Sequence, residues 1–158
     1  MNNDDHSKQK KYTTFFLMLG ASFVAMYITM YLNTYEVDHV YFSMTRFYMS
    51  CLGISTMAVI MWFFMRKMYQ NKSKNLGIIL GSILLFCTAL FLVRTQKPII
   101  GDVLWMKAMI PHHSIAILTS ERADIRDPEV KKLANDIIKA QRKEIGEMKA
   151  MIKRLEKD

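Results

Sequence analysis

A length of 158 residues is enough for about one domain, and 51% of the residues are hydrophobic, with a formal net charge of +8 at pH 7. The apolar residues are concentrated between Tyr12 and Val93, whereas after Gln96 the charges nearly balance, with 13 Lys and Arg against 10 Asp and Glu. This distribution argues against nucleic-acid binding and predicts a membrane part, residues 1–96, followed by a soluble part, residues 97–158.

The membrane part holds three apolar segments, and each is long enough for a helix to cross a hydrocarbon core of about 30 Å. They cover residues 13–32, 42–65 and 76–93. The first follows several lysines, as a signal-peptide core does, but it is longer than such a core and no cleavage pattern of small residues follows it. We therefore expect three retained transmembrane helices in contact with membrane lipid.

Positive charges indicate how these spans are oriented. Three lysines precede the first span, and residues 66–74 carry four Lys or Arg residues, whereas residues 33–41 carry none. Cytoplasmic loops are enriched in Lys and Arg. The sequence therefore predicts a multi-pass protein with a cytoplasmic N-terminus and an extracytoplasmic segment from residue 97 onward.

Several side chains inside the spans have two interpretations. Gly77 and Gly81 have the spacing that lets two helices approach closely. Cys51 and Cys87 fall inside spans, where a buried reduced cysteine is the ordinary interpretation, and the sequence leaves open whether they face each other. Methionines recur every four residues on one face of the second span, either as flexible packing groups or as a thioether path for a soft ion. These methionines are Met57, Met61 and Met65.

The soluble part is predicted to form a helical hairpin. Pro98 interrupts the preceding helix, and Asp102 is placed to cap a helix over residues 103–122. Asp127 and the proline that follows it give a stronger start signal, because they combine an N-cap residue with proline at the first helical position. The second helix should run to about Lys157 and lie antiparallel to the first, because the turn between them is short.

An apolar stripe runs along the second helix of this hairpin. Gln141 falls in the stripe and Glu144 lies near its centre line, and both should have partners because burying such groups unpaired is costly. A hairpin of this size is too small to cover its apolar faces alone, so we expect two chains to pair as a homodimer in a four-helix bundle. The stripe consists of Val130, Leu133, Ala134, Ile137, Ile138, Ile145, Met148, Ile152 and Leu155.

The first helix of the hairpin contains the most unusual segment, MKAMIPHHSIAI. On a helix, Met106, Met109 and His113 share one face within about 60°, and His112 is turned about 60° from Met109. Pro111 removes a backbone hydrogen bond and bends the helix, which can direct both imidazoles into one space. Thioethers and imidazoles are therefore expected close together.

Two thioethers with two imidazoles suit Cu(I) and related soft ions rather than Mg²⁺ or Ca²⁺. Met148 or Met151 can add sulfur from the second helix. Glu144 can orient an imidazole proton, and His39, predicted on the same side of the membrane, is a candidate auxiliary ligand. The alternative is a methionine core in which the histidines hydrogen-bond to Gln141 and Glu144 and fix the register of the hairpin. Spacing alone leaves both interpretations open.

Signatures of enzymes are missing from the sequence. The Glu-x-x-His motif of di-iron bundles and the His-Glu-x-x-His motif of zinc proteases do not occur, and there is no glycine-rich phosphate loop or nucleophile triad. A copper oxidoreductase needs a substrate site as well, of which the sequence gives no sign. We therefore expect a binding protein without catalytic residues, not an enzyme.

The run GDVLWMKAMIPHHSIAILTS and the following DPEVKKLANDIIKAQRKEIGEMKAMIKRLE resemble the bacterial family called domain of unknown function 305. The shared features occur in order, with Met-Ile-Pro-His-His at residues 109–113, Asp-Pro-Glu-Val at residues 127–130, and Gln141, Glu144 and Met148 on the second helix. The segment YFSMTRFYM before the second span also looks like the membrane-anchored branch of that family.

The resemblance implies a ferritin-like four-helix arrangement outside the cytoplasm, and it places this chain in the bacterial inner (cytoplasmic) membrane with a role in binding copper or silver. Many family members have a further methionine where this chain has Thr119, so one of the family's sulfur donors is missing here. The metal ligands implied by the resemblance are Met106, Met109, His112 and His113, with Met148 expected to contribute.

Overall fold

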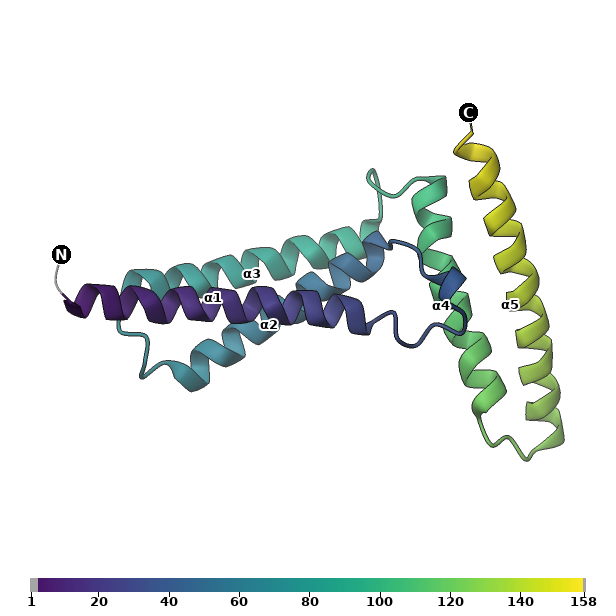
Figure 1. Ribbon diagram of the computed structural model, residues 1–158, viewed down its shortest axis with the longest axis horizontal. Coiled ribbons are helices and arrows are strands. Elements are labelled where there is room, and N and C mark those ends of the chain that lie inside the picture. Colours follow the sequence, from purple (N-terminus) through teal and green to yellow (C-terminus); the bar gives the residue numbers. More distant parts are fainter. Residues whose placement is uncertain (1–2, 158) are drawn as a thin grey trace. The chain divides into compact units, whose positions relative to one another are not determined.

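The structure, a computed structural model, describes the backbone of residues 3–157 and the side chains of residues 9–157. Within that range the fold is entirely helical, as predicted, and contains no strand (Figure 1). The elements in chain order are α1 (Asn3–Thr29), the 3-10 turn η1 (Val37–His39), α2 (Met44–Met65), α3 (Lys72–Thr95), α4 (Asp102–Arg122) and α5 (Pro128–Leu155).

Three helices are long and apolar enough to cross a membrane, as the sequence predicts. The corresponding segments are Gln9–Thr29, Met44–Met65 and Lys72–Thr95. The helix limits differ from the predicted ones where polar residues continue or cap a helix beyond its apolar part. For example, α3 begins at Lys72 rather than at residue 76, because the Asn71 side chain caps it by accepting a hydrogen bond from the Lys74 backbone N–H at 3.0 Å.

The chain divides into two compact units. The first contains α1 as far as Ile28, α2 from Arg46 onward and α3, and the second contains Thr29–Thr45 together with α4 and α5. In the first unit, Tyr12 and Phe15 of α1 are buried in a cluster with Ala58 of α2 and Ile78 of α3. Side chains from all three apolar helices therefore contribute to one core.

Close helix packing in this unit occurs at a glycine that the sequence analysis did not single out. A Cβ added at Gly53 of α2 meets the Met26 side chain of α1, with the Met26 sulfur at 2.8 Å. A Cβ added at Gly77 or Gly81 meets nothing within 4 Å among the described residues. Among the residues that the structure describes, Gly53 therefore marks a close helix contact, whereas Gly77 and Gly81 do not.

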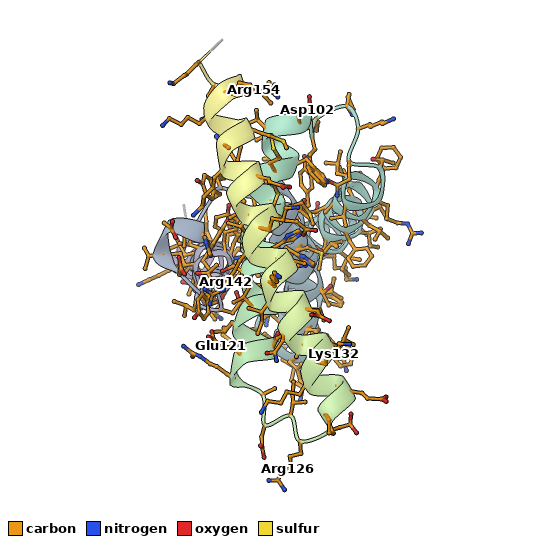
Figure 2. The ribbon with its side chains drawn as sticks, turned by 90° about the vertical axis from the view of Figure 1, so that its right-hand side faces the viewer. Asp102, Glu121, Arg126, Lys132, Arg142 and Arg154 are labelled. Carbon is orange, nitrogen blue, oxygen red and sulfur yellow. The ribbon has the colours of Figure 1, made fainter. Side chains whose placement is uncertain are left out.

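The second unit is built on the α4 and α5 hairpin. In Figure 2, Asp102 lies near Arg154 at one end, Glu121 lies near Lys132 at the other, and Arg126 marks the connecting turn, so the helices are antiparallel as predicted. Asp127 caps α5 by accepting hydrogen bonds from two backbone N–H groups at 2.9 Å each. The buried core of the hairpin consists of Met106, Ile110, Ile117, Ile145, Met148 and Ile152.

The start of the hairpin differs in detail from the prediction. The N-cap of α4 is Gly101, and Asp102 lies in the first turn of the helix instead of capping it. A first-turn carboxylate still interacts favourably with the helix dipole, so the start signal was correct to within one residue. Upstream, α3 ends at Thr95 and its C-cap Gln96 has a positive φ of 60°, so the helix stops before Pro98.

Residues Thr29–Thr45 dock onto the hairpin. The backbone N–H of Tyr35 donates to Ser114 Oγ in α4 at 2.7 Å, and Nδ1 of His39 lies 3.0 Å from the same oxygen. On the side of α5, Arg142 lies over the Tyr35 ring at 5.4 Å and Lys149 pairs with Asp38. This segment between α1 and α2 is thereby fixed to both helices of the hairpin.

Candidate functional site

Methionine side chains from both hairpin helices lie in one apolar core. Met106 of α4 and Met148 of α5 are 4% and 6% exposed and belong to the same buried cluster. Met109, one helical turn after Met106, is partly buried and packs against that cluster. Three of the five predicted metal ligands therefore lie in or against one side-chain cluster. Met106 and Met109 come from α4, and Met148 comes from α5.

His113 faces α5. Its Nδ1 lies 3.1 Å from Oε2 of Glu144, but the carboxylate lies off the direction of the ring N–H bond. Nδ1 is consequently buried without a hydrogen bond to any described residue. Burial lowers the pKa of His113 below its ordinary value, Glu144 opposes that shift and the neighbouring His112 adds to it. At neutral pH the ring is therefore uncharged and able to act as a ligand.

His112 lies differently from its neighbour. Its side chain is exposed, and its ring centroid is 6.1 Å from that of His113 with an angle of 60° between the ring planes. Pro111 is buried inside α4, which continues on both sides of it. Within this chain, His113 is the imidazole next to the hairpin core, and His112 is open to a ligand from outside.

The two polar residues predicted in the apolar stripe of α5 have different environments. Glu144 lies across the hairpin from His113, with its Oε2 3.1 Å from Nδ1 but not hydrogen-bonded to it. The prediction that Gln141 has a partner is wrong for its side-chain oxygen, because Oε1 is buried without a hydrogen bond to any residue the structure describes. Two polar atoms of the hairpin, His113 Nδ1 and Gln141 Oε1, are therefore left without hydrogen bonds.

The sequence analysis named His39 but not its neighbours Glu36 and Asp38. The structure brings all three side chains together, and His39 is 5% exposed. The spacing of two acids and a histidine within four residues, in the segment EVDH, was the available signal. His39 contacts α4 through Ser114, directly after the His112 and His113 pair.

Residues 101–158 match the family described as "Domain of unknown function (DUF305)". A relative named "Uncharacterized protein L153", from Acanthamoeba polyphaga mimivirus, is 36% identical over 139 residues, which is 86% of this chain and 89% of that protein. The chain belongs to the DUF305 family. No solved structure matches the chain significantly.

The DUF305 match covers α4 and α5, which carry the methionine cluster and the histidine pair. The similarity to the viral protein spans 139 residues and so extends beyond the hairpin into the part that holds the apolar helices. This relative is viral, so the comparison does not show a bacterial origin for the chain. Neither the family's name nor the relative's name assigns a ligand or an activity.

Proposed function

We propose that this DUF305 protein is a membrane-anchored binding protein for soft metal ions, Cu(I) with Ag(I) as an alternative, and that it acts in copper homeostasis or resistance. The observation that carries the proposal is the combination of a methionine cluster, formed by Met106, Met109 and Met148, with a buried unpartnered nitrogen on His113. Thioether sulfur and neutral imidazole are the donors that Cu(I) accepts most readily in proteins.

Each donor has a role in this proposal. Met106 and Met148 supply sulfur from inside the hairpin, and Met109 supplies it from the edge of the core. His113 adds its buried Nδ1, which has no hydrogen bond to any described residue, and the exposed His112 receives the ion from solution. The protein takes up and releases the ion without changing it chemically, so the role is that of a buffer or relay and not of an enzyme.

The proposed location is the inner membrane of a bacterium, with the hairpin on the extracytoplasmic side. Three candidate spans precede the hairpin, and lysines cluster before the first span and in residues 66–74. Residues 29–45 follow one proposed span and the hairpin follows three, an odd number in each case. Both segments then lie on the same side of the membrane. The contacts of Tyr35 and His39 with Ser114 agree with this, because they need both segments on one side of the membrane.

A competition titration of the full chain in detergent tests the proposal. Cu(I) is titrated against a chromogenic Cu(I) chelator, and the wild type is compared with a Met106→Leu, Met148→Leu double variant and with His113→Gln. Leucine keeps the apolar volume and removes only the sulfur, so stability is largely retained while Cu(I) affinity falls. Met151→Leu on α5 is the matched control, because Met151 is exposed and outside the cluster. Equal affinities in all four proteins would refute Cu(I) binding at this site.

A second candidate function is an interaction module in which two hairpins pair as a homodimer. It is favoured by large apolar side chains that the hairpin leaves exposed, and the exposed fraction of Leu133 is 59%. These side chains are Trp105, Val130, Leu133, Met151 and Leu155. Sedimentation of the full chain in detergent, with Leu133→Lys as the variant, tests the pairing. Wild type that sediments as a monomer at all concentrations would exclude it.

A further inference from the structure

A second group of metal-binding side chains lies in the segment between α1 and α2, apart from the methionine cluster. The ligand atoms of Glu36, Asp38 and His39 all lie within 4.8 Å of one another. Nε2 of His39 is 3.7 Å from Glu36 Oε2 and 3.7 Å from Asp38 Oδ1, which is too long for a hydrogen bond. Among the described residues, this nitrogen faces two carboxylates without bonding to either.

The two distances from His39 Nε2 are close to those between ligands of one metal ion, and all three ligand atoms lie within 4.8 Å of one another. Zn²⁺ binds histidine nitrogen and carboxylate oxygen at about 2.0 to 2.2 Å, so two ligands in tetrahedral arrangement lie about 3.4 Å apart. The observed 3.7 Å exceeds this by a few tenths of an ångström. The side chains of Glu36 and Asp38 are 53% and 65% exposed, so small rotations are open to both.

The His39 ring is held in an orientation suited to a ligand. The residue is 5% exposed, and its Nδ1 lies 3.0 Å from Ser114 Oγ of α4. Histidines that bind metals commonly fix the ring through a hydrogen bond at the other nitrogen. In the tautomer that donates Nδ1–H to Ser114, the lone pair of Nε2 points at two negative charges. A proton on Nε2 or a metal cation between the nitrogen and the carboxylates relieves this repulsion.

The two carboxylate oxygens of Asp38 face different partners. Its Oδ2 pairs with Lys149 of α5, which holds the pKa of Asp38 below its ordinary value, and its Oδ1 is the oxygen that faces His39. An ion at this position is thereby linked to α4 through His39 and Ser114, and to α5 through Asp38 and Lys149. Binding would therefore fasten Thr29–Thr45 more tightly to the hairpin.

We propose that Glu36, Asp38 and His39 form a binding site for a divalent transition-metal ion of the Zn²⁺ class, chemically distinct from the thioether site. The donors are one imidazole and two carboxylates without sulfur, a set that suits borderline divalent cations and not Cu(I) or Ag(I). Three protein ligands leave the remaining coordination position to water.

Zn²⁺ titration of the full chain in detergent, followed by calorimetry, tests this site. The informative variant is Glu36→Gln, because Glu36 makes no capping hydrogen bond to η1 and its loss leaves the local fold in place. We expect its Zn²⁺ affinity to fall about tenfold or more, since even residues that only support a metal ligand cost about 10- to 100-fold when removed. His39→Gln should lower the affinity in the same way.

Two controls locate the Zn²⁺. Glu147→Gln removes an exposed carboxylate of α5 that pairs with Lys143, and the Zn²⁺ affinity should stay unchanged. A His112→Gln, His113→Gln double variant should also bind Zn²⁺ as the wild type does. Zn²⁺ affinity that is unchanged in Glu36→Gln and His39→Gln overturns the proposal, and so does loss of Zn²⁺ binding confined to the His112 and His113 variant.

Discussion

Ser114 of α4 accepts the backbone N–H of Tyr35 at 2.7 Å across 79 residues of sequence. The serine is fully buried, and the same oxygen lies 3.0 Å from Nδ1 of His39. The hydroxyl group of Ser114 thus contacts two groups of the segment between α1 and α2, the backbone N–H of Tyr35 and the imidazole of His39. Because buried donors left without an acceptor are costly, this hydroxyl is important for the docking of that segment.

Ser114→Ala should therefore destabilise the second unit by about 1 to 3 kcal/mol, the cost of leaving buried polar groups unsatisfied. The measurement is denaturant unfolding of the full chain in detergent, followed by circular dichroism. Thr119→Ala is the matched control on the same helix, since Thr119 is exposed and its hydroxyl bonds only to carbonyls of its own helix. The control should change stability by no more than about 0.5 kcal/mol. Equal losses in the two variants would contradict the role of Ser114.

The two buried histidines make stability depend on pH. Burial lowers the pKa of His39, with Lys149 adding to the shift and Asp38 and Glu36 opposing it, and burial likewise lowers the pKa of His113. The unfolded chain then binds more protons than the folded one below the ordinary value of 6.5. Stability is therefore fully present above 6.5 and is lost as the pH falls toward the folded pKa values.

Unfolding of the full chain at several pH values between about 7.5 and 5 measures this dependence, in a range above the ordinary titration of carboxyl groups. In the wild type the free energy of unfolding should be nearly constant above 6.5 and should fall as the pH drops below it. His39→Gln and His113→Gln should each remove part of the slope, and the double variant should flatten it. A double variant with the full wild-type slope would assign the pH dependence to other groups.

Met148 and Met151 provide a test of the hairpin core within one turn of α5. Met148 is 6% exposed inside the cluster, whereas Met151 is 45% exposed. Met148→Ala should cost about 2 to 5 kcal/mol through lost burial and the cavity it leaves, and Met151→Ala should cost no more than about 0.5 kcal/mol. Thermal and denaturant unfolding compare the two. A smaller loss for Met148→Ala than for Met151→Ala would place the core on the other face of α5.

Much of the fold could be predicted because it follows from local signals. The three helices that are apolar enough to cross a membrane follow from long apolar segments, and the start of α5 follows from Asp127 and the proline after it, whose cap the structure shows. The hairpin itself follows from two periodic segments joined by a short turn. At the site, the 3- and 4-residue spacing correctly placed Met106 and Met148 on the faces where α4 and α5 meet.

The rest depends on contacts between residues far apart in sequence. Nothing near Tyr35 or His39 indicates that Ser114 is their partner, because 79 and 75 residues separate them. The close approach of Gly53 to Met26 was equally hidden, since a single glycine carries no spacing pattern. Gln141 was expected to be paired because buried amides usually are, and its unbonded oxygen is visible only once the helices are packed.

Gly53→Ala tests whether α1 and α2 pack as closely as the structure shows. The added Cβ lies 2.8 Å from the Met26 sulfur and 3.0 Å from its terminal carbon, so the Met26 side chain must leave its rotamer at a cost of about 0.5 to 1.5 kcal/mol. Gly81→Ala is the control, because a Cβ there meets nothing within 4 Å, and it should be neutral or stabilising. Unfolding in mixed micelles of mild detergent and dodecyl sulfate measures both. In a Met26→Ala background the Gly53→Ala penalty should disappear, since the atoms that clash are gone. A penalty that persists there would show that something other than Met26 opposes the methyl group.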